Sequence, residues 1–197
     1  MIREGRYRYE ILRRGEAVAV EETEVRAGTI ECVRRSADGM SRYEAHASLD
    51  EQGRVIRLAV RYTRGPFSRS ATYEAGDDFL RGSVSAMGAR TVETAKLGRF
   101  REVDAGTVLF RALVISHVRE RGQKQWTGRV ALIDPNTLLP ASVKQTCRQK
   151  DVSGLVWSYE PRMGDSEEIR FDEAGRLVSL ADNRGTLARL VGESAGG

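Results

Sequence analysis

The sequence predicts an all-β protein in which one large antiparallel sheet closes into a barrel or half-barrel and helices are at most short. Apolar and polar residues alternate with a period of two over most of the chain, which is typical of strands buried on one face. Turn-forming pairs such as Asp38-Gly39 separate these segments, and no segment has the 3.6-residue period of a helix longer than about three turns. The 197 residues fit a single domain, residues 1–197, with 1–98 and 99–197 as candidate repeat halves.

The first half has the pattern of a meander of strands joined by tight turns. In residues 6–11, Tyr7, Tyr9 and Ile11 alternate with other, mostly charged side chains, so one face of the strand is apolar. Comparable patterns predict strands over residues 17–25, 29–34, 43–49, 54–62, 67–74 and 79–84. Residues 85–106 are rich in small and polar types and are expected to connect the two halves.

The second half opens on an ambiguous apolar run, residues 108–118. Its β-branched residues, among them Val108, Val114 and Ile115, favour a strand over a helix. A clearer alternation begins at Trp126 and ends before Pro135, since proline cannot donate to a strand ladder. Further strands are expected over residues 143–149, 155–160, 166–171 and 176–181.

One ten-residue segment occurs twice. Residues 50–59 (DEQGRVIRLA) recur as residues 172–181 (DEAGRLVSLA), with six identities. In each copy the aspartate can accept hydrogen bonds from backbone amides to open a turn, and the glycine suits the left-handed position that closes it. The match predicts two similar hairpins and favours an internal duplication, although two unrelated hairpins can share this pattern by chance.

The charge and hydropathy patterns exclude several classes of protein. Arginine supplies 28 of the 32 cationic residues, and the net charge is +4. The longest apolar run is interrupted by Arg111 and His117, whereas a membrane-spanning helix needs about 20 apolar residues. The N-terminus lacks the apolar stretch of a signal peptide, so the expected location is cytoplasmic. Cys32 and Cys147 lie in no CxxC or Cys/His spacing and are expected to be small buried residues.

No catalytic motif is present in the sequence. It contains no nucleophile elbow, no glycine-rich phosphate loop before a helix, and no metal-ligand spacing around its two histidines, His46 and His117. We therefore expect no catalytic residues, no metal and no cofactor, and we favour a protein that is not an enzyme. An enzyme gains support if His46 or His117 meets a carboxylate inside a cleft.

Binding of an apolar or amphipathic small molecule, lipid-like or glycolipid-like, is the function that this fold class favours, because a large curled sheet can enclose a ligand cavity. The candidate ligand-binding residues are the aromatic and aliphatic residues on apolar strand faces: Tyr7, Tyr9, Leu58, Val60, Tyr62, Trp126 and Trp157. An alternative is a protein-interaction or assembly module without a ligand. The sequence does not fix an oligomeric state.

Nucleic-acid binding through an arginine-rich sheet face is a further alternative. The cationic residues that neighbouring strands could align are Arg6, Arg8, Arg57, Arg61 and Arg69. Acidic residues such as Glu22 and Glu24 are interleaved with them and would weaken attraction to phosphates. The pattern therefore disfavours nucleic acid as a partner.

Several segments, taken in order, resemble the bacterial family of glycolipid-binding proteins, a family named for an assumed activity. The segments that carry the likeness are Glu22 to Gly28, Tyr43 to Val60, Val108 to Leu113, Ala131 to Pro135, Val143 to Gln145 and Phe171 to Val178. The resemblance implies a duplicated β-barrel, distantly like the lipoprotein carriers of the outer-membrane localisation system, and a lipid or glycolipid-like ligand. Residues 105–109 (AGTVL) replace the family's Thr-Asn-Thr-Leu-Pro segment, so no ligand site is carried over by residue.

Overall fold

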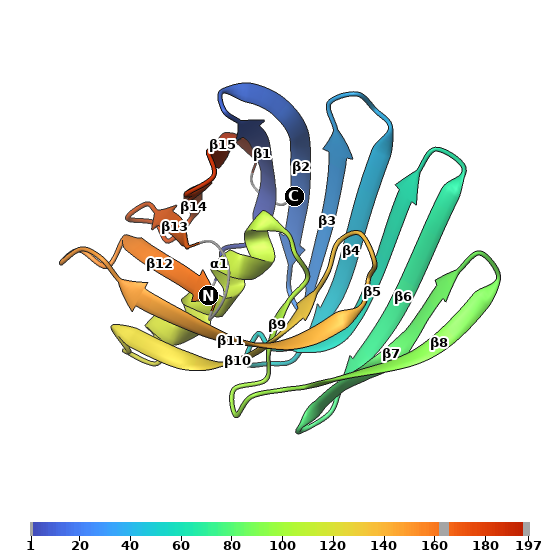
Figure 1. Cartoon of the computed structure of the whole chain (residues 1–197). Coiled ribbons are helices and arrows are strands. Elements are labelled where there is room, and N and C mark those ends of the chain that lie inside the picture. The colour runs from blue at the N-terminus through green and yellow to red at the C-terminus, as the bar shows by residue number, and fades with distance from the viewer. Residues whose placement is uncertain (1, 162–165, 195–197) are drawn as a thin grey trace.

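The computed structural model describes residues 2–161 and 166–194 and arranges them as one sheet of 15 strands around a single helix (Figure 1). The strands before the helix are β1 (Gly5–Arg13), β2 (Glu16–Arg26), β3 (Thr29–Ser36), β4 (Ser41–Leu49), β5 (Val55–Arg64), β6 (Phe67–Ala75), β7 (Phe79–Ala86), β8 (Ala89–Lys96) and β9 (Glu102–Asp104). Those after it are β10 (Gln125–Ile133), β11 (Pro140–Gln149), β12 (Val156–Pro161), β13 (Glu167–Phe171), β14 (Leu177–Asp182) and β15 (Thr186–Ser194).

The sheet consists of two meanders joined edge to edge. Its order is β8-β7-β6-β5-β4-β3-β2-β1-β15-β14-β13-β12-β11-β10-β9, so the first and last strands of the chain pair with one another. Neighbours are antiparallel except β9 and β10, which are parallel. Strand β8 lies near β10 and β11 without a ladder to either, so the sheet curls back on itself (Figure 1). The predicted all-β class is confirmed. The sheet is curled, and the order of its hydrogen-bonded strands begins at β8 and ends at β9.

The helix α1 (Val108–Glu120) lies within the curl of the sheet, where a strand was predicted; that prediction is wrong. Thr107 is the N-cap, with extended backbone (φ −108°, ψ 165°) and a hydroxyl that accepts from the amide of Phe110. Nearly every position from Val108 to Val118 is buried, so the sequence has no polar face from which a 3.6-residue period could be recognised. Burial on all sides thus outweighs the preference of β-branched residues for strands.

The prediction that residues 85–106 form a plain connection is also wrong. They include strand β8 and the short strand β9. Strand β8 is exposed along most of its length because it lies at one end of the sheet, so its sequence shows little alternation. Strand β9 is fully buried and leads directly into the cap of α1.

The two copies of the repeated segment form closely similar hairpins. The Asp50 carboxylate accepts from the amide of Arg54 at 2.9 Å, and the Asp172 carboxylate accepts from the amide of Arg176 at 2.9 Å. Gly53 and Gly175 both have positive φ, at 74° and 80°. The hairpins join β4 to β5 and β13 to β14, which are the fourth and fifth strands of the meanders that begin at β1 and β10. This equivalent placement agrees with a duplication, which stays a prediction.

Tyrosines on the concave face attach the sheet to the segments inside it. The Tyr43 hydroxyl of β4 donates to the carbonyl of Ala105 at 2.6 Å, directly before α1. The Tyr73 hydroxyl of β6 donates to the carbonyl of Leu138 at 2.6 Å, in the β10–β11 connection. Within the described ranges no helix is long and apolar enough to cross a membrane.

Candidate functional site

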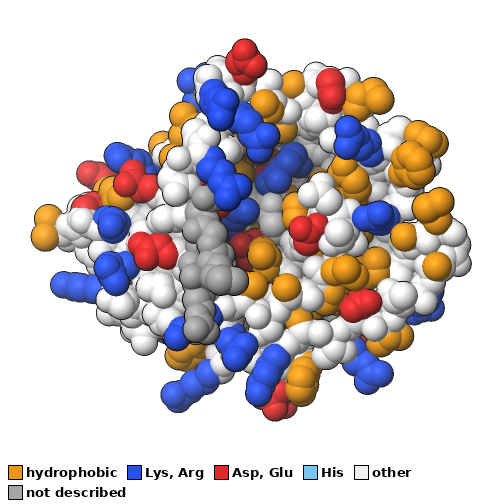
Figure 2. Space-filling view, viewed as in Figure 1, with side chains coloured by type: hydrophobic (Ala, Val, Ile, Leu, Met, Phe, Trp, Pro, Cys, Tyr) orange, Lys and Arg blue, Asp and Glu red, His pale blue; other side chains and the backbone are white. Residues whose placement is uncertain are grey.

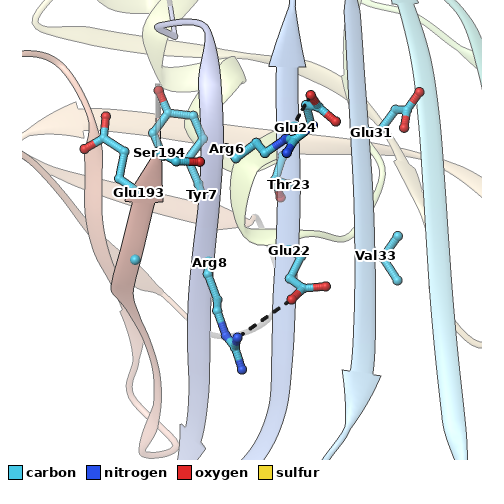
Figure 3. Close-up of a pocket in the computed structure, with 11 residues that line it drawn as sticks. Arg6, Tyr7, Arg8, Glu22, Thr23, Glu24, Glu31, Val33, Glu193 and Ser194 are labelled. Carbon is cyan, nitrogen blue, oxygen red and sulfur yellow. Dashed lines mark hydrogen bonds and ion pairs between the residues drawn. The ribbon is translucent and has the colours of Figure 1, made fainter. Parts of the chain in front are cut away.

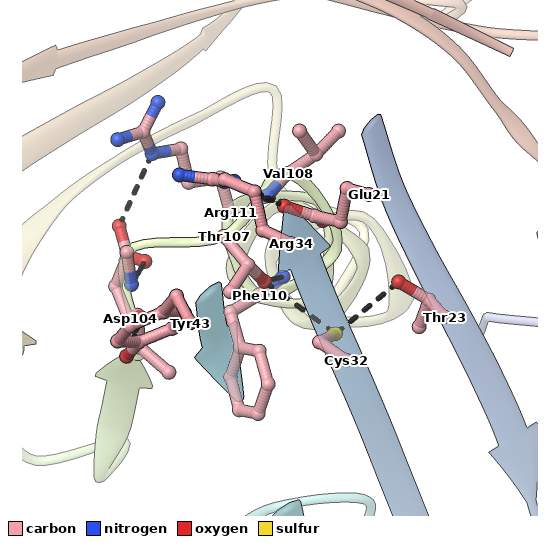
Figure 4. A network of polar contacts seen from close by, with 12 residues as sticks. Glu21, Thr23, Cys32, Arg34, Tyr43, Asp104, Thr107, Val108, Phe110 and Arg111 are labelled. Carbon is pink, nitrogen blue, oxygen red and sulfur yellow. Dashed lines mark hydrogen bonds and ion pairs between the residues drawn. The ribbon is translucent and has the colours of Figure 1, made fainter. Parts of the chain in front are cut away.

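A group of charged side chains lies at the N-terminal end of α1, inside the curl of the sheet (Figure 4). We call it the interior cluster; its members are Glu21 (β2), Arg34 (β3), Asp104 (β9), Arg111 (α1) and Glu167 (β13). Strands β2 and β3 belong to the first meander and β9 follows it, whereas α1 and β13 come later in the chain. The cluster therefore forms only when the two meanders come together.

Glu21 anchors the helix to the sheet. Its side chain is fully buried, and its two oxygens accept from the Val108 amide at 2.9 Å and from Arg34 Nε at 2.9 Å. The Val108 amide is one of the N–H groups that the first turn of a helix cannot bond internally. A carboxylate here also meets the positive end of the helix dipole.

Arg111 joins two carboxylates on the other side of the cluster. It forms an ion pair with Glu167, and its Nε lies 3.6 Å from Asp104 Oδ2. Burial favours the neutral form of Arg111, but the charges of Glu167 and Asp104 outweigh it and raise its pKa. Asp104 also accepts from the Gly106 amide at 2.7 Å and from the Tyr159 hydroxyl at 3.2 Å.

Glu167 is the member of the cluster with hydrogen-bonding capacity to spare. Burial raises its pKa to about 7, because the loss of water outweighs the nearby guanidinium group of Arg111. Its Oε2 atom is buried and has no hydrogen-bond partner among the described residues. A buried polar atom without a partner costs about 1–3 kcal/mol, so such an atom requires an explanation.

The cluster is within reach of solvent. The side chains of Arg34 and Arg111 are 25% and 27% exposed, although Glu21 and Asp104 beside them are buried. Figure 2 shows this side of the molecule, on which basic side chains gather around a hollow near the centre. The interior cluster thus provides fixed donors and acceptors, two of which, Arg34 and Arg111, are partly exposed to solvent.

The predicted ligand-binding residues of the N-terminal strands are core residues in the structure. The Tyr7 hydroxyl donates to the Arg3 carbonyl at 2.7 Å, and the Tyr9 hydroxyl donates to the Leu177 carbonyl at 3.3 Å. On β5, Leu58 and Val60 are buried and Tyr62 is half-buried at the margin of the core. None of the five belongs to the interior cluster, and their contact with a ligand stays a prediction.

The two predicted tryptophans pack against neighbouring backbone. The Trp126 ring covers Gly128, where an added Cβ would lie 2.1 Å from it, and stacks at a tilt on Phe100 with centroids 6.3 Å apart. The Trp157 indole donates to the Gly154 carbonyl at 2.9 Å. Neither ring lies in the interior cluster, so their role as ligand contacts also stays a prediction.

The sequence contained a signal for the interior cluster, but the search for catalytic and binding motifs did not find it. Glu21 stands in phase with Ala19 and Val25 on β2, and Arg34 stands in phase with Cys32 on β3. A charged residue in phase with apolar residues points into the core, where it must find a partner. The partners themselves are far away in the chain, with Val108 87 positions from Glu21.

A groove on the convex face contains Arg6 and Arg8, two of the five arginines considered for nucleic-acid binding (Figure 3). It has a volume of about 440 Å³ and is lined by β1, β2, β3 and the end of β15. Arg6 pairs with Glu24 at 3.1 Å, and Arg8 approaches Glu22 at 3.9 Å. Because two arginines face four glutamates in this lining, the groove does not attract a phosphate backbone.

The two histidines differ in their surroundings. His46 is exposed on the convex face, 3.2 Å from Glu31. His117 is buried near the C-terminal end of α1, where its Nδ1 lies 2.8 Å from Glu102 Oε2. The contact between a histidine and a carboxylate that would support the enzyme alternative is therefore present at His117. Among residues 2–161 and 166–194, no group of three or more His, Cys, Asp or Glu side chains could hold a metal ion.

Comparison with known proteins defines the fold and no more. No family model and no curated protein matches the chain. Among solved structures, the chain is similar to a DUF1089 family protein from Pseudomonas aeruginosa, with 16% sequence identity and a TM-score of 0.60. The match covers 85% of this chain and 91% of that one. The chain thus shares the fold of that DUF1089 protein over most of its length.

Proposed function

We propose that this protein binds an amphipathic small molecule, lipid-like or glycolipid-like, whose hydroxyl-bearing head group lies against the interior cluster. The observation that carries the proposal is the Oε2 atom of Glu167, which is buried beside Arg111 and has no hydrogen-bond partner among the described residues. Neither catalysis nor a cofactor forms part of the proposal, and the expected location remains cytoplasmic.

The hydrogen-bonding capacity of the concave face favours hydroxyl groups. Gln145 of β11, two strands from β13, is also buried, and its Oε1 has no hydrogen-bond partner in the part of the chain that the structure describes, so this face offers a second free acceptor. Arg34 and Arg111 supply partly exposed donors in the interior cluster. A sugar hydroxyl donates one hydrogen bond and accepts others, which suits a surface that presents both kinds of group.

The concave face also has partly exposed apolar side chains for the other end of such a ligand. Tyr62 and Val143 are half-buried at the margin of the core, in phase with buried concave-face residues of β5 and β11. Burial of an acyl chain against such side chains contributes about 0.8 kcal/mol per methylene. The resemblance seen in the sequence implies the same class of ligand.

Native mass spectrometry of the purified protein tests the proposal by looking for a co-purifying lipid. An alkyl glucoside below its micelle concentration is then compared with a fatty acid of equal chain length. We expect the glucoside to bind more tightly, and Glu167→Gln or Arg111→Met to weaken it about tenfold or more. Glu168→Gln, on the exposed side of β13, is the matched control. Equal binding of the two ligands, or of the Glu167 and Glu168 variants, would contradict the proposal.

A second candidate function is assembly through the free edge of β8. Val92 on this strand is 67% exposed, and Met87 in the preceding turn is also exposed. An exposed apolar edge strand can pair with another chain. If it does, size-exclusion chromatography with light scattering will show a dimer that Val92→Lys converts to a monomer; a monomeric parent protein would exclude this function.

A further inference from the structure

A second polar site lies at the opposite end of α1. A pocket of about 230 Å³ opens between the β4–β5 hairpin, the β8–β9 connection and the end of the helix. We call it the C-terminal pocket; it is lined by Gln52, Arg54, Arg99, Phe100, His117, Glu120 and Arg121. It shares no residue with the interior cluster.

Glu102 fixes the two functional groups at the base of this pocket. Its Oε2 lies 2.8 Å from His117 Nδ1, and its Oε1 accepts from Arg121 Nη2 at 2.9 Å. Because a carboxylate accepts hydrogen bonds, the neutral imidazole has its proton on Nδ1 and its lone pair on Nε2. The Arg121 guanidinium also lies over the Phe100 ring, 3.9 Å from the centroid, which fixes its plane.

Two polar atoms of this arrangement are buried and have no hydrogen-bond partner within residues 2–161 and 166–194. They are Nε2 of His117 and Nη1 of Arg121, and His117 as a whole is 5% exposed. Gly53 forms the wall next to the imidazole, since an added Cβ would lie 3.3 Å from Nε2. One atom is an acceptor and the other a donor, so a ligand that satisfies both must donate one hydrogen bond and accept another.

Arginine is the commonest charged residue in the lining of the pocket. Three arginines line it against one glutamate, Glu120, while Asp50 and Glu102 lie behind Arg54 and Arg121 as their ion-pair partners. Arg99 is exposed and contacts Phe100 at 5.8 Å from the ring centroid. The last turn of the helix also holds Arg119, whose charge offsets the negative end of the helix dipole.

We propose that the C-terminal pocket binds the phosphate group of a phosphate monoester. A singly protonated phosphate donates its P–O–H hydrogen to His117 Nε2 and accepts from Arg121 Nη1, which satisfies both buried atoms. Arg54 and Arg99 approach the remaining oxygens, as guanidinium groups commonly do with phosphate. The second pKa of a phosphate monoester is about 6, so the protonated form is available near neutral pH.

Inorganic phosphate is the probe, and the two histidines make the experiment specific. Long-range ¹H–¹⁵N NMR of the full chain resolves two imidazoles, which a His46→Asn variant assigns. We expect His117 in its Nδ1–H form, and phosphate to shift its Nε2 signal while His46 stays unchanged. Sulfate has no proton to donate at neutral pH and should shift His117 at least about tenfold more weakly. An unshifted His117 at saturating phosphate, or equal effects of the two anions, would overturn the proposal.

The repeated hairpin supplies a matched control. Arg54 and Arg176 make the same hydrogen bonds to their aspartates, but only Arg54 lines the pocket. Arg54→Gln should weaken phosphate binding at His117 about tenfold, and Arg176→Gln should leave it unchanged. Arg99→Gln, an exposed substitution, should weaken it in a chain that remains fully folded. Equal affinities in the Arg54 and Arg176 variants, or no loss with Arg99→Gln, would count against the site.

Discussion

The two ends of α1 differ in the charged groups that surround them. At the N-terminal end, three carboxyl groups surround two arginines, and the atom without a partner among the described residues is a carboxyl oxygen, Glu167 Oε2. At the C-terminal end, three arginines face one lining glutamate, and the unpartnered atoms include a guanidinium donor, Arg121 Nη1. The carboxylates at the N-terminal end match the positive end of the helix dipole.

The buried charged groups around α1 fall into two kinds: those whose polar atoms are all bonded within the protein, and those with an atom left for a ligand. Both oxygens of Glu21 are bonded to protein groups, so Glu21 holds the helix in the sheet. Glu167 and His117 each retain a buried atom without a hydrogen-bond partner among the described residues, and His117 also lines the C-terminal pocket. One helix thus orders two sites that would accept chemically different groups, hydroxyl donors at its start and phosphate oxygens at its end.

Removal of the anchor should have the largest effect on stability. Glu21→Ala leaves the Arg34 guanidinium and the Val108 amide without their partner, and loss of one member of a buried ion pair typically costs about 3–5 kcal/mol. Glu22→Ala, the next residue on the opposite face, removes only exposed ion pairs and should cost less than about 1 kcal/mol. Urea unfolding measures both, and similar losses in the two variants would show that Glu21 is not an anchor.

The pH dependence of stability should identify Glu167. Its pKa is about 7 in the folded chain against an ordinary value of 4.5, so the folded state retains a proton that the unfolded state has lost between these values. The free energy of unfolding should therefore fall as pH rises from about 4.5 to 7, by up to about 3 kcal/mol, and then level off.

The matched variants attribute this slope to one residue. Glu167→Gln cannot titrate and should flatten the curve between those pH values, whereas Glu168→Gln should retain the slope because that side chain is exposed. Denaturant unfolding at a series of pH values provides the comparison. If the Glu167 variant keeps the parent slope, another group is responsible and the burial of Glu167 has less effect than its pKa implies.

The sequence predicted features that depend on neighbouring residues and missed those that depend on distant ones. Alternation around Tyr7 and Tyr9 was sufficient to find β1, and the repeated segment was sufficient to find two similar hairpins. The helix was missed because its surroundings bury nearly every side, which depends on the curl of the whole sheet. The interior cluster was missed for a related reason, since it draws residues from five separate elements.

The two hairpins offer the smallest and most selective comparison. Gly53→Ala and Gly175→Ala each place a Cβ at positive φ, which costs about 1 kcal/mol in both. The Cβ at Gly175 meets nothing within 4 Å, whereas the one at Gly53 lies 3.3 Å from His117 Nε2, so the imidazole must shift. Gly53→Ala should therefore cost somewhat more, by less than about 1 kcal/mol, and should alone move the His117 NMR signal. Unchanged His117 resonances in Gly53→Ala would mean that this hairpin does not position the imidazole. In that case the β4–β5 hairpin would have no contact with the C-terminal pocket at Gly53 that the equivalent β13–β14 hairpin lacks.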